Sequence, residues 1–299
     1  MSTSYMTNIN PEHKKWGMII FASILITLLL IYKIYSYVIP AASETIANKL
    51  PSSVAESVGE ETLKTLDEEQ LKPTALSEEE QTRLQTLFAQ YIPVAEVKKS
   101  PAETTHSETD ANHDKIALDN EKYSLLFRDW PDTANALALA NGTIILTDKM
   151  IAIAENDQQL AAVIFHELGH IEHNHSIKNL VQVSIIALTM ALLFGDITTL
   201  NVILIQGATM STSLSYSRKA ELEADLYATQ KMEQHFGSAE EFINVLTLLE
   251  QDYLATKNKQ ASNENDEHTE DDNNFSNWFS SHPSLKTRIA EIKNNSQSH

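Results

Sequence analysis

Asp157-Gln-Gln-Leu-Ala-Ala-Val-Ile-Phe-His-Glu-Leu-Gly-His-Ile-Glu172 is the most strongly patterned stretch of this sequence. Asp157 opens it with a residue type that caps helix N-termini well. Apolar residues then recur with the spacing of one helix face, and they are Leu160, Ile164, Leu168 and Ile171. The stretch therefore predicts a long helix whose apolar face is turned towards a protein core.

The middle of this predicted helix carries His166-Glu167-Leu168-Gly169-His170. Residues four apart in a helix differ in direction by about 40°, so both imidazoles can hold one Zn²⁺ at about 2.0–2.1 Å. Glu167 lies about 100° from His166, where it can reach a water at the metal and act as general base. The string also fits a helix whose histidines only cap or pair with other groups. Its position after the apolar run 160–165 favours a metal site, because buried unpaired polar groups are costly.

A catalytic zinc commonly takes three protein ligands and keeps one position for water, so a third ligand is needed. A second helix is predicted over about 215–236, ending at Gly237. Glu221 and Asp225 share one face of it, whereas Glu223 points about 200° away from Glu221 and is interpreted as solvated. We predict Glu221 as the third ligand and Asp225 as the acceptor for the free ring N–H of a ligand histidine. Taken alone, the segment also fits an ordinary charged helix face.

Together these motifs resemble gluzincin metallopeptidase family 48, which includes HtpX, BepA and the CAAX prenyl endopeptidase. The resemblance covers roughly Leu76 to Asn294 and implies a zincin-like fold with one Zn²⁺ per chain. It implies that His166, His170 and Glu221 bind zinc and that Glu167 is the catalytic base, with Asp225 behind a ligand. Shorter matches are Asn135-Ala136, Gly142-Thr143-Ile144, Glu155-Asn156-Asp157, Ser217-Arg218, Ser281-His282-Pro283 and Arg288-Ile289.

Three residues outside the main motifs are further site candidates. By the resemblance, His282 lies near the cleft and either contacts the metal or stabilises the developing oxyanion, unless it only caps the turn before Pro283. Arg288 either contributes to the site or pairs with an acid. His175 would lie about 180° around a continuous helix from His166, which favours a structural role.

Two short apolar or β-branched runs, residues 122–127 and 142–146, are predicted strands. The second resembles the edge strand that pairs with the substrate backbone in gluzincins. Gly142, Thr143 and Ile144 are therefore candidate substrate-contacting or oxyanion residues. Recognition through the backbone would be only loosely specific for sequence.

Residues 16–39 form a long apolar stretch that only Lys33 interrupts. As a helix it would be about 36 Å long, enough to cross a hydrocarbon core of about 30 Å. We predict an uncleaved transmembrane anchor. The alternative is a cleaved signal peptide, for which Ala41-Ala42-Ser43 is a weak cleavage site.

The charges around this stretch predict its orientation. His13, Lys14 and Lys15 precede it, whereas residues 34–48 carry only Glu44. By the positive-inside rule, residues 1–15 are expected in the cytoplasm. The catalytic domain is then expected on the outer, periplasmic or extracytoplasmic, side of the membrane.

The composition limits the remaining possibilities. The chain has 299 residues, of which 42% are hydrophobic, too many for overall disorder. Lys+Arg 22 against Asp+Glu 41 gives a net charge of −19, which argues against nucleic acid as a partner. With Cys 0, a metal must use His, Asp or Glu. Gly 7 and Pro 8 are few, which favours an α+β, mostly helical fold over a turn-rich β fold.

Polarity along the chain predicts its organisation. Residues 40–75 are acidic and are interpreted as a stalk, and residues 76–299 as the zinc metallopeptidase domain. Residues 100–114 and 257–274 are polar and are interpreted as flexible insertions. The apolar runs 180–194 and 200–210 predict a buried helical hairpin, with a membrane-dipping hairpin as the alternative.

These features predict a membrane-anchored zinc metalloendopeptidase that hydrolyses peptide bonds in proteins. The expected substrates are unfolded or misassembled envelope proteins, and the expected role is envelope protein quality control. The alternative is a non-cleaving, chaperone-like or binding module with a structural zinc.

Overall fold

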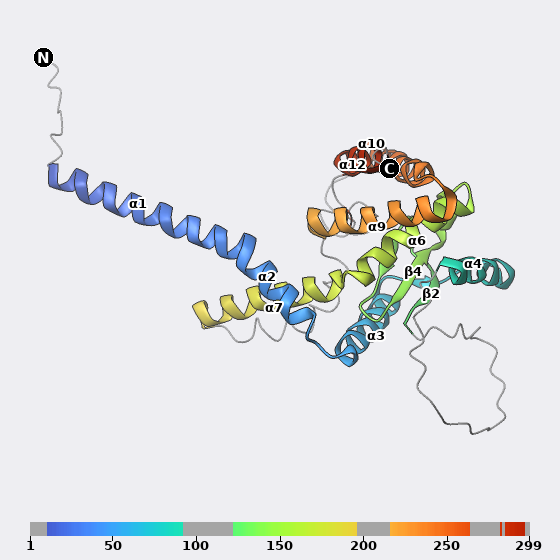
Figure 1. Cartoon of the computed structure of the whole chain (residues 1–299), viewed down its shortest axis with the longest axis horizontal. Coiled ribbons are helices and arrows are strands. Elements are labelled where there is room, and N and C mark those ends of the chain that lie inside the picture. Colours follow the sequence, from blue (N-terminus) through green and yellow to red (C-terminus); the bar gives the residue numbers. More distant parts are fainter. Residues whose placement is uncertain (1–10, 92–121, 196–215, 264–281, 283–284, 297–299) are drawn as a thin grey trace, which may run out of the picture.

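The computed structural model describes residues 11–91, 122–195, 216–263, 282 and 285–296. These residues form mostly helices and one small mixed sheet, which confirms the predicted α+β class. In Figure 1, helix α1 (Pro11–Lys33) extends away from the body of the molecule. A π-helical segment (Ile34–Val38) joins it to α2 (Ile39–Ala47) on the body.

The sheet has four strands in the order β1-β2-β4-β3. They are β1 (Lys72–Pro73), β2 (Ser124–Asp129), β3 (Ala136–Ala138) and β4 (Thr143–Thr147). Strand β4 pairs in parallel with β2 and antiparallel with β3. The strands predicted at 122–127 and 142–146 are therefore present, but the second is not an edge strand. A run such as Ile144-Ile145-Leu146, apolar on both faces, belongs inside a sheet, and the edge strands are β1 and β3.

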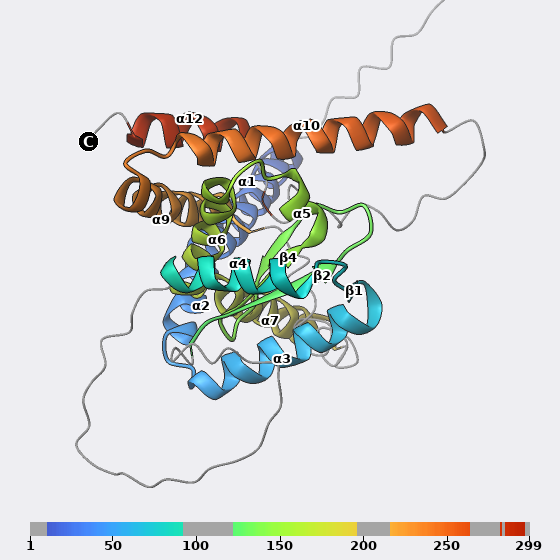
Figure 2. The same cartoon turned by 90° about the vertical axis from the view of Figure 1, so that its right-hand side faces the viewer.

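Helices cover both faces of the sheet (Figure 2). Leu125, Ile144 and Leu146 pack with α4 (Glu78–Tyr91) and α6 (Asp157–Glu172) in the main core. On the opposite face, Leu137 and Ile145 pack against α3 (Ser52–Glu69). This alternation follows from the two-residue period of a strand.

Residues 40–75 are part of the body and do not form the predicted stalk. Helix α3 buries Leu66, which lies in a cluster with Leu71 and the sheet. Arg128 on β2 binds the Asp67 carboxylate with Nε 2.7 Å from Oδ1. The acidic composition hid this packing, because a helix needs only one apolar stripe to dock on a sheet.

Helix α6 packs closely against α9 (Arg218–Phe236). Gly169 makes this possible, since a Cβ there would lie 2.9 Å from the Cα of Ala224. The N-terminal caps are Asn156 for α6, rather than the predicted Asp157, and Ser217 for α9. Helices α10 (Glu240–Asn263) and α12 (Leu285–Ser296) complete the same core, as Figure 2 shows.

Helix α7 (His175–Phe194) lies beside α2 and is only partly buried (Figure 1). Ile177 and Val181 pack with Ala47, whereas Leu192 and Leu193 are exposed. The first arm of the predicted hairpin, residues 180–194, is therefore a helix that is only partly buried. Its second arm, residues 200–210, lies outside the described residues.

The predicted insertions correspond only partly to described structure. Residues 257–263 form the end of α10 rather than an insertion. Residues 100–114 and 264–274 lie outside the described residues.

Candidate metal centre

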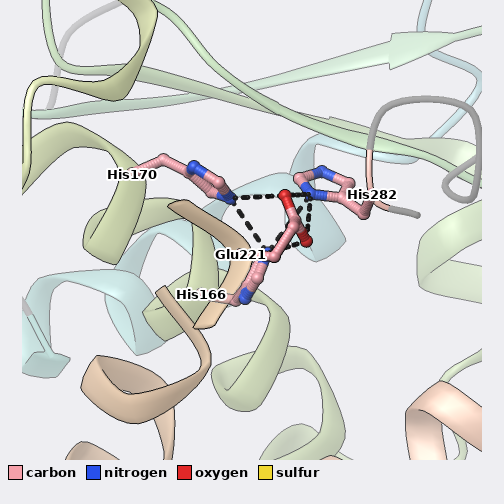
Figure 3. Close-up of side chains that lie close together, drawn as sticks. All are labelled: His166, His170, Glu221 and His282. Atoms are coloured by element: carbon pink, nitrogen blue, oxygen red, sulfur yellow. Dashed lines mark hydrogen bonds and ion pairs between the residues drawn. The ribbon is translucent and has the colours of Figure 1, made fainter. Parts of the chain in front are cut away.

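Four buried side chains meet between α6 and α9. His166 and His170 come from successive turns of α6, Glu221 comes from the first turn of α9, and His282 precedes α12. Figure 3 shows their polar atoms pointing towards one another. One donor atom from each residue lies within 4.8 Å of all the others. The three ligands predicted from the sequence are therefore brought together, and His282 adds a fourth donor.

The distances between these donors fit a small cation. His166 Nε2 lies 3.1 Å from His170 Nε2 and 3.3 Å from His282 Nδ1. Glu221 Oε1 lies 3.5 Å from His170 Nε2 and 3.0 Å from His282 Nδ1. A tetrahedral zinc with bonds of about 2.0–2.1 Å has donor atoms about 3.3 Å apart. Nitrogen and carboxylate donors at this spacing match the preference of Zn²⁺ for such ligands.

Burial prepares the two α6 histidines for metal binding. It lowers the pKa of His166 to about 4, although Asp225 opposes the shift, and it lowers the pKa of His170 well below its usual value. Both imidazoles are therefore neutral at pH 7. Neutral histidine is the form that binds a metal ion.

A buried ion pair between α9 and α12 supports the donor set. His166 Nδ1 lies 3.0 Å from Asp225 Oδ1, which is the position predicted for Asp225. Arg288 donates to both Asp225 oxygens, at 2.7 and 2.6 Å, and its NH1 lies 3.0 Å from Glu221 Oε2. Although burial opposes ionisation, Arg288 holds the pKa of Asp225 below its usual range. Arg288 therefore pairs with acids, one of the two alternatives that the sequence left open.

Replacing Arg288 by methionine is expected to lower the free energy of unfolding by about 3–5 kcal/mol, because Asp225 and Glu221 would remain as buried, uncompensated carboxylates. Urea unfolding of the full chain in detergent measures this, with a chelator present so that no metal compensates Glu221. Arg128→Met is the matched control. It breaks a partly exposed pair with Asp67 and is expected to cost about 0–1 kcal/mol. Equal losses in the two variants would contradict this account of Arg288.

Glu167 lies beside the donor set but is not part of it. Its side chain is fully buried and neither carboxylate oxygen has a hydrogen-bond partner of normal geometry among the described residues. The His282 ring lies beside it, with Nε2 3.5 Å from Glu167 Oε1. Burial raises the pKa of Glu167 to about 7, against the opposing effect of His282. A carboxyl group poised near neutral pH is suited to accept and return a proton.

Sequence reasoning missed the residues around His170. The Tyr216 ring stacks on the His170 ring, with centroids 4.0 Å apart. His175 Nδ1 lies 2.9 Å from His170 Nδ1, and His175 Nε2 lies 3.0 Å from Glu223 Oε2. His175 was predicted to lie opposite the site because a continuous helix was assumed. Glu223 does point away from Glu221 on α9, as predicted, but it binds His175, which the turn between α6 and α7 brings to the site. Asn174 was the available signal, since Asn readily adopts the left-handed conformation that ends a helix.

The residues predicted to contact substrate, Gly142, Thr143 and Ile144, instead pack against other parts of the protein. Gly142 has φ +86°, and a Cβ there would collide with the carbonyl oxygen of Lys122. The Thr143 hydroxyl accepts a hydrogen bond from Ser124 Oγ at 3.0 Å, and Ile144 is fully buried in the core. Thr143 and Ile144 belong to an internal strand, and Gly142 directly precedes it. On β3, the backbone of Ala138 lies next to Glu167.

Comparisons with known proteins identify a family. The family model described as "Peptidase family M48" matches residues 99–296, which is most of the chain. No curated protein matches the chain significantly.

Proposed function

Because the chain belongs to peptidase family M48 and is thus a metallopeptidase, we propose that it is a zinc-dependent endopeptidase acting on proteins. The proposed ligands are His166, His170 and Glu221, with one Zn²⁺ per chain. The observation that carries the proposal is the buried Glu167 carboxylate, which lies beside a donor set of zinc-like spacing and has no hydrogen-bond partner of normal geometry among the residues that the structure describes. Such a group is costly unless it serves a reacting molecule.

In the proposed mechanism, Glu167 is the general base. A zinc ion bound at the cluster would act as a Lewis acid and lower the pKa of water from 15.7 to about 7. Glu167 takes the proton from the water as its oxygen adds to the scissile carbonyl carbon. The C–N bond then breaks, and Glu167 returns the proton to the leaving amine. Low solvent access around Glu167 keeps this proton within the site.

We assign His282 to stabilisation of the oxyanion. Its ring lies between Glu221 and Glu167, with Nδ1 3.0 Å from Glu221 Oε1 and Nε2 3.5 Å from Glu167 Oε1. A hydrolytic zinc needs one position that is not occupied by a protein ligand. His166, His170 and Glu221 lie on α6 and α9, whereas His282 lies outside both helices. We therefore leave His282 out of the ligand set.

We propose β3, rather than Gly142–Leu146, as the strand that takes the substrate backbone. The pairing of Leu137 with Ile145 and the bond from Leu139 N to Thr143 O leave the backbone of Ala136 and Ala138 facing away from β4. Ala136 N donates to Asn135 Oδ1 and Ala138 O accepts from Ser176 Oγ, so a substrate strand would replace these two contacts. Ala138 is also the sheet residue next to Glu167. A substrate added to this edge would place a peptide bond close to the base.

We propose that α1 and its continuation anchor the protein in a membrane. Within the part of the chain that the structure describes, two helices are long and apolar enough to cross a membrane, Lys15–Ala47 and His175–Leu193. Residues 41–43 lie inside helix α2 and Ser43 is buried, which supports an uncleaved anchor over a signal peptide cut at these residues. The charge bias around the segment supports a cytoplasmic N-terminus and an outer catalytic domain. Unfolded or misassembled envelope proteins are the proposed substrates.

A second candidate function follows from the fourth donor. Four protein donors without an open position are typical of structural zinc sites. This observation favours a non-cleaving, chaperone-like or binding module. A non-cleaving module would give the buried, ionisable Glu167 no role, and we therefore place this function second.

Incubation with an unfolded, casein-like substrate tests the endopeptidase proposal. We expect purified full-length protein in detergent to produce internal fragments, detected by mass spectrometry, because zinc and Glu167 together activate water. A zinc chelator is expected to stop cleavage, and added Zn²⁺ to restore it. Intact substrate under all conditions would favour the second candidate, and cleavage that persists in excess chelator would contradict a metal mechanism.

A further inference from the structure

A single left-handed residue brings His175 to the metal centre. Helix α6 ends at Glu172, Asn174 has φ 53° and ψ 36°, and α7 begins at His175. A continuous helix would have placed His175 on the side opposite the site. After the turn, its ring is only 4% exposed and its Nδ1 lies 2.9 Å from His170 Nδ1.

Polar contacts join His170 to His175, His175 to Glu223 and Glu223 to Lys219. With a metal on His170, only one placement of the ring protons satisfies them. His170 Nε2 belongs to the donor set, so as a metal ligand it keeps its lone pair there and carries its proton on Nδ1. That proton can be donated only to an unprotonated His175 Nδ1. His175 then carries its own proton on Nε2 and donates it to Glu223 Oε2 at 3.0 Å. Glu223 in turn pairs with Lys219, with Oε1 3.5 Å from Nζ.

The flat face of the His170 ring has a partner of its own, Tyr216. Tyr216 stacks on it with an interplanar angle of 22°, and the Tyr216 hydroxyl lies 3.0 Å from Ser176 Oγ. Stacking restricts tilting of the ring but does not decide which of its two nitrogens carries the proton. The contact with His175 Nδ1 decides it, because it holds the proton on His170 Nδ1.

We propose that His175 and Glu223 are a positioning pair that fixes the tautomer and orientation of His170, an inference that rests on His170 being a zinc ligand. The pair does for His170 what Asp225 does for His166, with Asp225 Oδ1 3.0 Å from His166 Nδ1. A partner that accepts the second ring N–H of a ligand histidine typically contributes 10–100-fold in metal affinity, about the loss expected here.

Zinc affinity of the full-length protein in detergent, measured by competition with a chromogenic chelator, tests the pair. His175→Ala is expected to bind zinc about 10–100-fold more weakly. His175→Gln offers an acceptor oxygen to His170 and is expected to recover much of the affinity. His175→Phe keeps the ring volume without an acceptor and is expected to bind as weakly as the alanine variant. Glu223→Gln is expected to show a smaller loss, since its amide oxygen can still accept from His175.

Two control variants lie on α9 away from the site, His235→Gln and Glu233→Gln, and both are expected to bind zinc as the wild type does. Circular dichroism of the metal-free proteins checks folding, and Glu223→Gln keeps the test decisive if a His175 variant fails to fold. Wild-type affinity in His175→Ala, or full recovery in His175→Phe with none in His175→Gln, would overturn the positioning role. Absence of zinc binding by the wild type would instead reject the proposed function itself.

Discussion

Glu167→Gln is expected to lower the rate of cleavage by about 10²–10⁴-fold while leaving zinc bound. The amide has almost the same shape as the carboxylate but cannot take a proton from water. No described hydrogen bond of normal geometry is lost, and a neutral amide is easier to bury than a carboxylate, so the fold is expected to persist. Initial rates on an unfolded substrate measure the effect, with metal content determined on the same preparation.

Glu172→Gln is the matched control for this substitution. Glu172 ends the same helix and pairs at the surface with Lys122, with Oε1 2.8 Å from Nζ. It is expected to cleave at the wild-type rate. Wild-type turnover by Glu167→Gln would reject the general-base assignment. Full biological complementation by Glu167→Gln, with zinc still bound, would favour the non-cleaving module.

His166→Ala is expected to reduce the zinc content from one ion per chain to almost none, and cleavage with it. His166 is the central donor, since its Nε2 lies 3.1 Å from His170 Nε2 and 3.3 Å from His282 Nδ1. Its removal also leaves Asp225 without the imidazole that contacts Oδ1. Elemental analysis after dialysis against micromolar zinc measures the loss.

His235→Ala is the control for removal of an imidazole. His235 lies on α9, where its ring stacks on Phe165 away from the donor set. It is expected to keep one zinc per chain. Retention of stoichiometric zinc by His166→Ala, with His235→Ala unchanged, would show that the metal is held elsewhere.

The predicted ligands were accessible to sequence reasoning because their geometry is local. His166 and His170 lie one turn apart on one helix, and so do Glu221 and Asp225, so helix periodicity alone places each pair on one face. That the two helices pack together followed from the need of a catalytic zinc for a third protein ligand. The structure brings these side chains together as expected.

Other features could not be predicted because they depend on distant pairings or on single dihedral angles. Gly142–Leu146 reads as a strand from its residues, but whether it lies at an edge depends on the partner β3. The acidic segment 40–75 packs on the sheet through a few apolar residues such as Leu66. His175 enters the site because Asn174, between α6 and α7, adopts the left-handed conformation.

The sequence by itself determined the helical class, the two motif helices and the face on which their donors lie, because hydrophobic periodicity and residue spacing act within one helix. Only the tertiary structure decided that β3 lies at an edge of the sheet, that His282 lies beside the three predicted ligands and that Arg288 pairs with both Asp225 and Glu221. It also decided that His175 and Glu223 stand behind His170. The physical reason is that these contacts join segments far apart in the chain, or follow a turn, and their positions are set by packing rather than by local periodicity.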